Sequence, residues 1–332
     1  MTTGEPKLKS KYLMALAATF LAFSTAAAAA EGRFERTLQV TGPVDLTVQT
    51  GAGTVTVRTG DASKVEVRGT IRAWGGLFSE DEARKRVSYI ESHPPIEQNG
   101  NVIRIGKAGD SHMQRNLTIS YDLVVPPNTK LTSKTGSGNQ TIDGISGPLE
   151  ASIGSGDIKA SNIASSVQAS TGSGQVVLVS IAKDVRVTTG SGGVHATGIG
   201  GNVRASTGSG EVTIEEAGAG DVHVNTASGN IVLKKVRGLV QAKTASGSIT
   251  AEGGGQSPWY LETVSGNVSV RVPPNLGFDL HAHTVSGSIS TNRPLTLQGA
   301  ISKREINGKA GSGGFLLDVS TVSGNINIDW VA

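Results

Sequence analysis

The sequence predicts an all-β protein, a parallel β-solenoid of two-stranded coils of about 18 residues, with one short helix in its N-terminal region. Three observations predict this fold. A Ser-Gly pair recurs at a nearly fixed spacing, apolar residues stand two apart between the pairs, and many of the 45 glycines in the 332 residues share the same period. Random glycine would indicate disorder, whereas periodic glycine indicates repeated tight turns.

The Ser-Gly pair sets the length of one coil. Its serine recurs at a constant step through the first repeats and at slightly longer steps after them, before a gap near the C-terminus. These serines are Ser137, Ser155, Ser173, Ser191, Ser209, Ser228, Ser246, Ser265, Ser286 and, after the gap, Ser323. We hypothesise that their hydroxyls form hydrogen bonds from coil to coil along one edge.

Each coil divides into two short strands joined by two turns. In residues 174–190, Val176 and Leu178 form one alternating pair and Val185 and Val187 form another, which is the period of a half-buried strand. Stacking the coils places apolar residues in three columns. The columns are Ile158, Val176, Val194, Val212, Ile231, Ile249 and Val268; Leu149, Val167, Val185, Val203, Val222 and Val240; and Ile145, Ile163, Ile181 and Ile199. A slip of one residue would expose a whole column, so the register should be fixed.

Residues 1–30 have the features of a secretory signal peptide. Three lysines precede an apolar run over residues 12–23, and the alanines at 26–30 provide a cleavage site before Glu31. The alternative is an uncleaved anchor, because residues 13–30 are just long enough to cross a bilayer. We predict an exported protein of the bacterial periplasm, cell surface or outer envelope, with membrane contact only through an uncleaved signal. The absence of Cys means that the exported chain does not rely on disulfides.

Residues 31–130 do not follow the repeat, and we expect them to cap the N-terminal end of the stack. Strand-like runs occur at 44–48, 55–57, 65–71, 102–105 and 117–125. Ser79-Glu80-Asp81-Glu82 is a capping box that predicts one helix to about Ile90, before the stop at His93-Pro94-Pro95. Gln140 falls in an apolar column, which suggests a coil at the boundary of the stack.

Residues 131–332 contain the solenoid repeats and a C-terminal closing coil. Val272-Pro273-Pro274 interrupts one strand, and residues 292–314 break the regular spacing. Beyond this excursion, Phe315, Ile326 and Trp330 are among the largest apolar side chains of the late sequence. We expect them to close the stack.

The charge balance argues against nucleic-acid partners. The formal net charge of +3 falls to +1 without residues 1–30, which hold three lysines and Glu5. Nucleic-acid binding usually needs a clustered basic face, and the sequence has no such cluster.

The sequence contains no convincing metal or cofactor motif. A calcium-binding β-roll has a repeat of the same length but needs aspartates in every turn, whereas Asp157 and Glu211 are isolated. His281 and His283 share a strand face, yet no carboxylate or third histidine stands at the matching position of the next coil. His195 and His223 are expected to be surface residues. Gly-Ser-Gly turns lack the following helix and Lys-Ser/Thr of a phosphate loop.

Catalysis is not expected either. Glu215 and Glu216 are adjacent in sequence, as are Lys234 and Lys235, so the members of each pair point to opposite faces of a strand. Residues 139–255 contain no aromatic side chain that could serve as a sugar platform. We therefore predict no catalytic, metal-binding or cofactor-binding residues, no small-molecule cofactor and no enzymatic activity.

Three features stand out together: Thr50-Gly-Ala-Gly-Thr-Val-Thr-Val57, Tyr121-Asp-Leu-Val-Val-Pro-Pro127, and the repeated Thr-x-Ser-Gly-x-Ile/Val turns. On these features the chain resembles, over about residues 33–332, the bacterial DUF4097 family, whose members are often named as candidate adhesins. The resemblance implies a parallel β-solenoid on an exported or envelope-associated protein and no catalytic motif. The long, regular central run departs from the family pattern.

Two function classes follow. The first is an adhesin-like module that presents a flat polar face to a cell-surface glycan or an envelope protein. The second is a periplasmic scaffold that assembles through its ends. A polysaccharide-active enzyme is a third, weaker alternative. Capping at both ends would favour the binding module, because assembly needs an open end.

Overall fold

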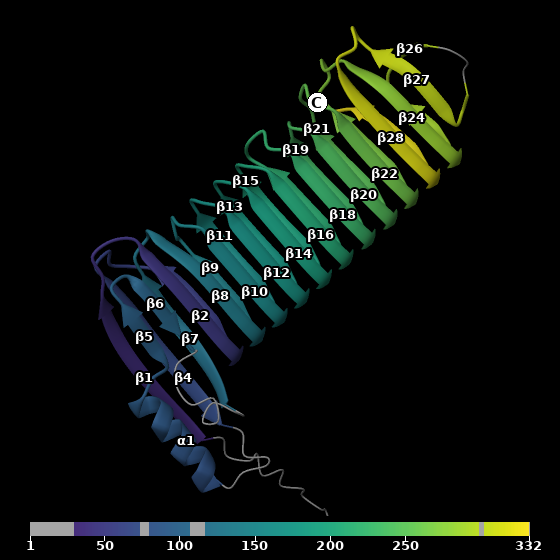
Figure 1. Cartoon of the computed structure of the whole chain (residues 1–332). Coiled ribbons are helices and arrows are strands. Elements are labelled where there is room, and N and C mark those ends of the chain that lie inside the picture. The colour runs from purple at the N-terminus through teal and green to yellow at the C-terminus, as the bar shows by residue number, and fades with distance from the viewer. Residues whose placement is uncertain (1–29, 74–79, 107–116, 299–301, 332) are drawn as a thin grey trace, which may run out of the picture.

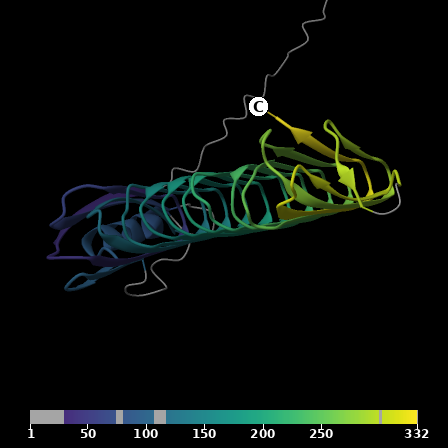
Figure 2. The same ribbon diagram turned by 90° about the horizontal axis from the view of Figure 1, so that it is seen from above.

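The computed structural model describes residues 30–73, 80–106, 117–298 and 302–331, and these residues form a long, thin rod (Figure 1). Two stacked sheets lie on opposite sides of the rod (Figure 2). The predicted all-β solenoid with one helix is confirmed. The signal peptide predicted for residues 1–30 lies outside the described residues except for Ala30, as does Ser79 of the capping box.

The first sheet, sheet A, has 14 strands among the described residues. In spatial order from the N-terminal end they are β1 (Ala30–Gln39), β4 (Lys64–Ala73), β7 (Leu117–Val125), β3 (Val55–Thr59), β9 (Gln140–Asp143), β11 (Ile158–Ile163), β13 (Val176–Ile181), β15 (Val194–Ile199), β17 (Val212–Glu216), β19 (Ile231–Val236), β21 (Ile249–Gly253), β23 (Val268–Val272), β29 (Ile326–Trp330) and β25 (Ile289–Thr291).

The second sheet, sheet B, has 15 strands among the described residues. In the same direction they are β5 (Ile96–Asn99), β6 (Val102–Ile105), β2 (Val44–Ala52), β8 (Thr129–Ser137), β10 (Leu149–Ser155), β12 (Val167–Ser173), β14 (Val185–Ser191), β16 (Val203–Ser209), β18 (Val222–Ser228), β20 (Val240–Ser246), β22 (Trp259–Ser265), β28 (Phe315–Ser323), β24 (Phe278–Ser286), β27 (Glu305–Ala310) and β26 (Thr296–Leu297). One helix, α1 (Glu80–Ser92), completes the described secondary structure.

The core is the space between the two sheets. Equivalent residues of successive coils pair in parallel: Val167 with Val185 in sheet B, and Val176 with Val194 in sheet A. All members of the three predicted columns are buried, so the predicted register is confirmed. Because each coil contributes only a few aliphatic side chains, its strands depend on both neighbouring coils for burial.

The Ser-Gly edge holds the coils at close distance through backbone groups. We call the glycine of a Ser-Gly pair a ladder glycine. Its N–H donates to the serine carbonyl of the next coil, as from Gly156 to Ser173 at 2.8 Å. Gly174 has φ +145°, and a Cβ there would collide with the carbonyl oxygen of Gly156. Only glycine therefore satisfies both the backbone conformation and the contact.

In several coils, hydrogen bonds across this edge come from a threonine hydroxyl two residues before the serine. Thr171 donates to the carbonyl of Gly156 at 3.0 Å and Thr207 to that of Gly192 at 3.0 Å. These threonines point inward and are buried. The hypothesised role of the serine hydroxyls thus belongs to the threonine, while serine contributes its backbone carbonyl.

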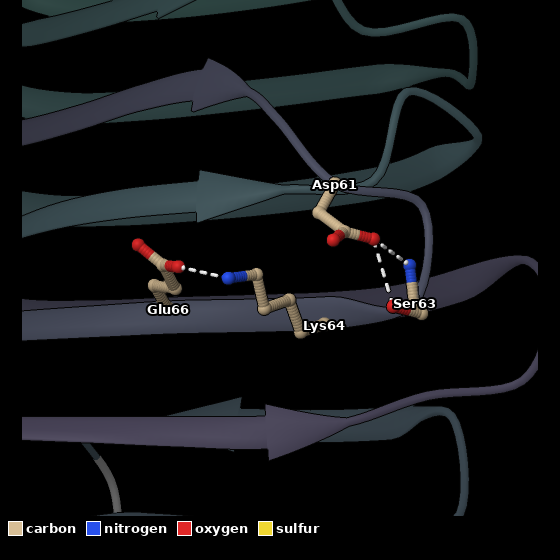
Figure 3. A network of polar contacts seen from close by, with 4 residues as sticks. All are labelled: Asp61, Ser63, Lys64 and Glu66. Carbon is tan, nitrogen blue, oxygen red and sulfur yellow. Dashed lines mark hydrogen bonds and ion pairs between the residues drawn. The ribbon is translucent and has the colours of Figure 1, made fainter.

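The first coil of the stack consists of β2 and β3, which pair with β8 and β9. Residues 60–128 form an insertion whose strands extend both sheets beyond this coil. In the turn that opens the insertion, Asp61 accepts from the N–H and hydroxyl of Ser63 at 2.8 and 2.7 Å, and Lys64 pairs with Glu66 (Figure 3). The bonds from Ser63 lower the pKa of Asp61.

Gln140 is not in a boundary coil, contrary to the interpretation of the sequence. It is fully buried between Val55 and Ile158, which belong to the coils on either side. Its amide nitrogen donates to the Thr135 hydroxyl at 2.9 Å and to the Ser152 carbonyl at 3.1 Å. These bonds let a polar side chain occupy an aliphatic column, a possibility that the periodicity alone does not reveal.

Helix α1 packs against β1 and β4 at the N-terminal end of sheet A (Figure 1). Its buried residues Ala83, Val87 and Ile90 share one face. Gly32 of β1 allows this close packing, because a Cβ there would collide with Val87. Among the described residues, no helix is long and apolar enough to cross a membrane.

At the C-terminal end, the last coil in the sequence is not the last coil in space. Strands β28 and β29 insert between the β22–β23 coil and the β24–β25 coil. The predicted bulky side chains therefore lie inside the stack: Phe315 packs on Trp259 and Phe278, with ring centroids 5.7 and 5.9 Å apart. Strands β27 and β26 then cover the end of sheet B, with β27 antiparallel to β24.

Glu216 interrupts the aliphatic column of Ile181 and Ile199. The β15–β17 pairing skips one residue, so that Glu216 pairs with Ile199 and turns inward, 2% exposed. Glu215 points outward and pairs with Lys235 at 2.7 Å, as expected for adjacent strand residues. Burial raises the pKa of Glu216 to about 7, an effect that the backbone of Gly220 partly offsets.

Replacing a ladder glycine should destabilise the whole rod. We expect Gly174→Ala to lower the free energy of unfolding by about 2–3 kcal/mol, because alanine is strained at this φ and its Cβ meets backbone. Gly193→Ala is the matched control, since a Cβ there meets only one atom, at 3.3 Å. Urea unfolding of both variants measures the difference; equal losses would contradict the role of the ladder.

Glu216 should make stability depend on pH. Its folded pKa of about 7 exceeds the model-peptide value of 4.5, so between these pH values the folded state binds more protons than the unfolded state. The free energy of unfolding should therefore fall as pH rises, by roughly 3 kcal/mol from this group. Glu216→Gln should remove this part of the pH dependence in urea unfolding from pH 4.5 to 8. Glu215→Gln is the control, and an unchanged slope for Glu216→Gln would contradict the assignment.

Candidate binding surface

The acidic groups that the sequence singled out as candidate calcium ligands form local hydrogen bonds. Asp157 accepts from the N–H of Gln175 at 2.8 Å, and Glu211 accepts from the Thr213 hydroxyl at 3.0 Å, so both serve local turn structure. Among the residues that the structure describes, no group of three or more His, Cys, Asp or Glu side chains could hold a metal ion.

The two histidines of β24 do have a carboxylate beside them, contrary to the expectation. His281 pairs in register with Asp318 of β28, and its Nδ1 lies 3.4 Å from the Asp318 carboxylate. The sequence order hid this neighbour, because β25, β26 and β27 lie between β24 and β28 in the chain. His283 pairs in register with Glu305 of the antiparallel strand β27. His195 and His223 lie on the outer faces of sheets A and B, respectively.

The outer face of sheet B carries a continuous line of polar side chains along the rod. We define its central row as one outward residue from each successive strand, β8 to β24. The central row is Thr132, Glu150, Gln168, Arg186, Arg204, His223, Gln241, Tyr260, Asp318 and His281. A parallel hydroxyl row lies beside it. The hydroxyl row is Ser152, Ser170, Thr188 and Ser206, and the amide of Asn225 follows it on the next strand.

Neighbouring members of each row are separated by about 4.8 Å, the spacing between hydrogen-bonded strands. The rows therefore run along the axis of the rod rather than along any strand, as the ordered arrows of sheet B in Figure 1 show. A ligand on this face would meet a new side chain from every coil. Extended polymers suit such a surface better than compact small molecules.

Shallow hollows lie along the central row. One, of about 300 Å³, is lined by Gln168, Arg186 and Arg204, among others, and one of about 280 Å³ by Arg186, Arg204 and His223. A third, of about 630 Å³, contains Tyr260 with polar neighbours. Tyr260 is the aromatic side chain of the central row, beyond the aromatic-free stretch that the sequence analysis noted.

Most charges on this face are paired, but the two central arginines are not. The ion pairs are Lys130–Asp45 at 3.3 Å, Lys134–Glu150 at 3.9 Å, Lys243–Glu262 at 2.6 Å, His281–Asp318 at 3.4 Å and Lys309–Asp279 at 3.5 Å. Within the described residues, neither Arg186 nor Arg204 lies within ion-pair distance of a carboxylate, although the two face each other on adjacent strands.

Sequence analysis missed this arginine pair, although a signal was present. Arg186 and Arg204 are one coil apart in the sequence and occupy the same outward position of consecutive coils. The three predicted columns contain inward residues only. The same period applied to the outward positions places the two arginines side by side.

Comparison with known proteins agrees with this architecture. The Toastrack DUF4097 family model matches residues 164–329, which is half of the chain. This protein belongs to the DUF4097 family. The match spans the coils from β12 to β29 and confirms the resemblance found in the sequence. No curated protein matches the chain.

Several solved structures are similar to this DUF4097 chain. A candidate cell adhesion protein from Clostridium sporogenes is 13% identical, with a TM-score of 0.20 and coverage of 90% of this chain and 100% of that one. A candidate adhesin from Bacteroides fragilis is 11% identical, with a TM-score of 0.28, and a candidate lipid-binding protein from Parabacteroides distasonis is 12% identical, with a TM-score of 0.39. The last two alignments each cover 90% of this chain and 97% of the other.

Removing one of the facing arginines should stabilise the protein. Like charges directly opposite each other on adjacent strands are unfavourable, and relieving them in Arg186→Gln should raise the free energy of unfolding by about 0.2–1 kcal/mol. Lys134→Gln is the control on the same face, because it loses the ion pair with Glu150 and should not stabilise. Urea unfolding at low salt measures both. Destabilisation by Arg186→Gln would show that the arginine has a stabilising partner.

Proposed function

We propose that this protein is an exported, non-enzymatic, adhesin-like module of the bacterial cell envelope that binds a polysaccharide with the outer face of sheet B. The observation that carries the proposal is the central row: a continuous line of polar side chains with hollows and one aromatic ring, presented by a rigid stack. Protein sites that bind sugars commonly use aromatic side chains for packing and amide or hydroxyl side chains for hydrogen bonds.

The ends of the rod argue for binding rather than assembly. Sheet A begins at β1, which is antiparallel to β4 and covered by α1, and it ends at the three-residue strand β25. Sheet B ends at the two-residue strand β26. Short or covered edges resist pairing with another chain. The scaffold alternative, which needs an open end, has less support from this geometry.

The carboxylates also fit binding better than catalysis. Glu262 and Asp318 lie near Tyr260 on the outer face; Glu262 is exposed and paired with Lys243, and Asp318 is half-buried and paired with His281. A general acid needs a raised pKa beside the substrate. Glu216 has a raised pKa but lies in the core, away from this face. Export rests on the signal-like residues 1–30.

Binding by the outer face of sheet B predicts a face-specific loss on substitution. We expect the purified protein to bind at least one of three immobilised polysaccharides in biolayer interferometry: dextran, carboxymethyl-dextran or dextran sulfate. Tyr260→Ala should weaken this binding at least threefold, because the ring lines the hollow of about 630 Å³. Val232→Ala on the outer face of sheet A is the matched control. Absence of binding to all three would contradict the proposal.

Location is tested separately with an epitope tag within residues 292–314, outside the regular repeat. Protease treatment of intact cells should remove the tag if the rod is outside the cell. A tag that is cleaved only after the outer envelope is permeabilised would contradict adhesion and support the periplasmic scaffold.

A further inference from the structure

Arg186 and Arg204 occupy an unusual position in the charge pattern of the rod. They are the same residue at the same outward position of consecutive coils, on the adjacent strands β14 and β16. Both side chains are exposed and neither forms an ion pair among the described residues. Two facing cations are unfavourable for folding, so the stack itself provides no reason for this pairing.

The carboxylates in the turns that precede β14 and β18 form hydrogen bonds elsewhere. Asp184 precedes Arg186 by two residues, and its Oδ1 accepts from the N–H of Asn202 at 2.8 Å. Asp221 stands at the matching position before His223 and accepts from the N–H of Leu239 at 3.0 Å. Both carboxylates hold the corner between coils. The guanidinium groups therefore keep their hydrogen-bond donors available for a ligand.

The surroundings of the arginine pair provide further donors. Hollows lie on both sides of the pair, and both are lined by the two arginines. His223 follows in the central row, and its Nδ1 lies 2.9 Å from Oε1 of Gln241. This contact holds the imidazole ring beside the arginine pair. Thr188 and Ser206 add hydroxyls beside the arginines in the hydroxyl row.

We propose that Arg186 and Arg204 form a binding site for an anionic group of a polysaccharide, a carboxylate or a sulfate ester, with Thr188, Ser206 and His223 at its border. This inference rests on the proposed function and names the ligand class of the same face. A planar guanidinium binds an oxyanion through two parallel hydrogen bonds, and an anion between two such groups neutralises their mutual repulsion.

An acidic polysaccharide fits this site better than a nucleic acid does. Within the central row, the unpaired arginines lie on two adjacent strands, and acidic side chains occur near both ends of the row, at Glu150 and Asp318. A nucleic acid needs a longer basic track to neutralise consecutive phosphates. A glycan with spaced acidic groups can place one anion on the pair and a sugar ring toward Tyr260, three strands along the row from Arg204.

The test uses the same three polysaccharides, which share one backbone and differ in charge. The wild-type protein should bind carboxymethyl-dextran or dextran sulfate at least tenfold more tightly than neutral dextran, and the preferred polymer identifies carboxylate or sulfate. The double substitution Arg186→Gln/Arg204→Gln should weaken that binding at least tenfold. Arg186→Lys/Arg204→Lys keeps the charge but loses the planar fork, and it should give an intermediate loss.

The control is Lys159→Gln/Lys234→Gln, which removes the same charge from exposed positions on the outer face of sheet A. It should change binding by less than threefold. Equal losses in the two glutamine double variants would overturn the proposal in favour of general electrostatic attraction. No preference for the charged polymers would also overturn it, while Tyr260-dependent binding of neutral dextran would leave the proposed function intact. Failure to bind any of the three would overturn both.

Discussion

The close approach of backbones at the Ser-Gly edge is the constraint on which the rest of the rod depends. At this edge the ladder glycines leave no room for a side chain, as the contact between Gly174 and the Gly156 carbonyl shows. The inward threonines then bond across the same gap, as Thr171 does to Gly156. These contacts set the relative position of neighbouring coils along the strand direction. Once that position is set, the inward and outward residues of successive coils fall into rows wherever the register continues without a shift.

This constraint explains which features were predictable from sequence. The constant length of one coil defines the rows, and β-branched residues at alternating positions identify the inward ones, such as Val176 and Val194. The helix was predictable because its start and stop signals are local. Such features require only that each residue be compared with the residue one coil away.

The features that sequence did not reveal are those that break the period. Strand β28 lies between β22 and β24 and pairs with both. Asp318 therefore lies beside His281, although their separation in the sequence is not the length of one coil. Glu216 turns inward because the pairing between β15 and β17 passes over one residue of β15. Gln140 stays buried because its amide nitrogen reaches two hydrogen-bond acceptors. Each of these features depends on neighbours in three dimensions, so the periodicity of the sequence does not predict it.

The same logic separates structural from functional residues on the surface of the rod. An outward residue of a solenoid has its equivalents of neighbouring coils as nearest contacts, so selection for stability alone favours neutral or oppositely charged neighbours. The rod follows this at Lys134 and Glu150 and at Lys243 and Glu262. Arg186 and Arg204 depart from it without any compensating contact in the stack. A departure that costs stability and leaves hydrogen-bond donors exposed is best explained by something outside the stack, and the chemistry of two guanidinium groups specifies an anion.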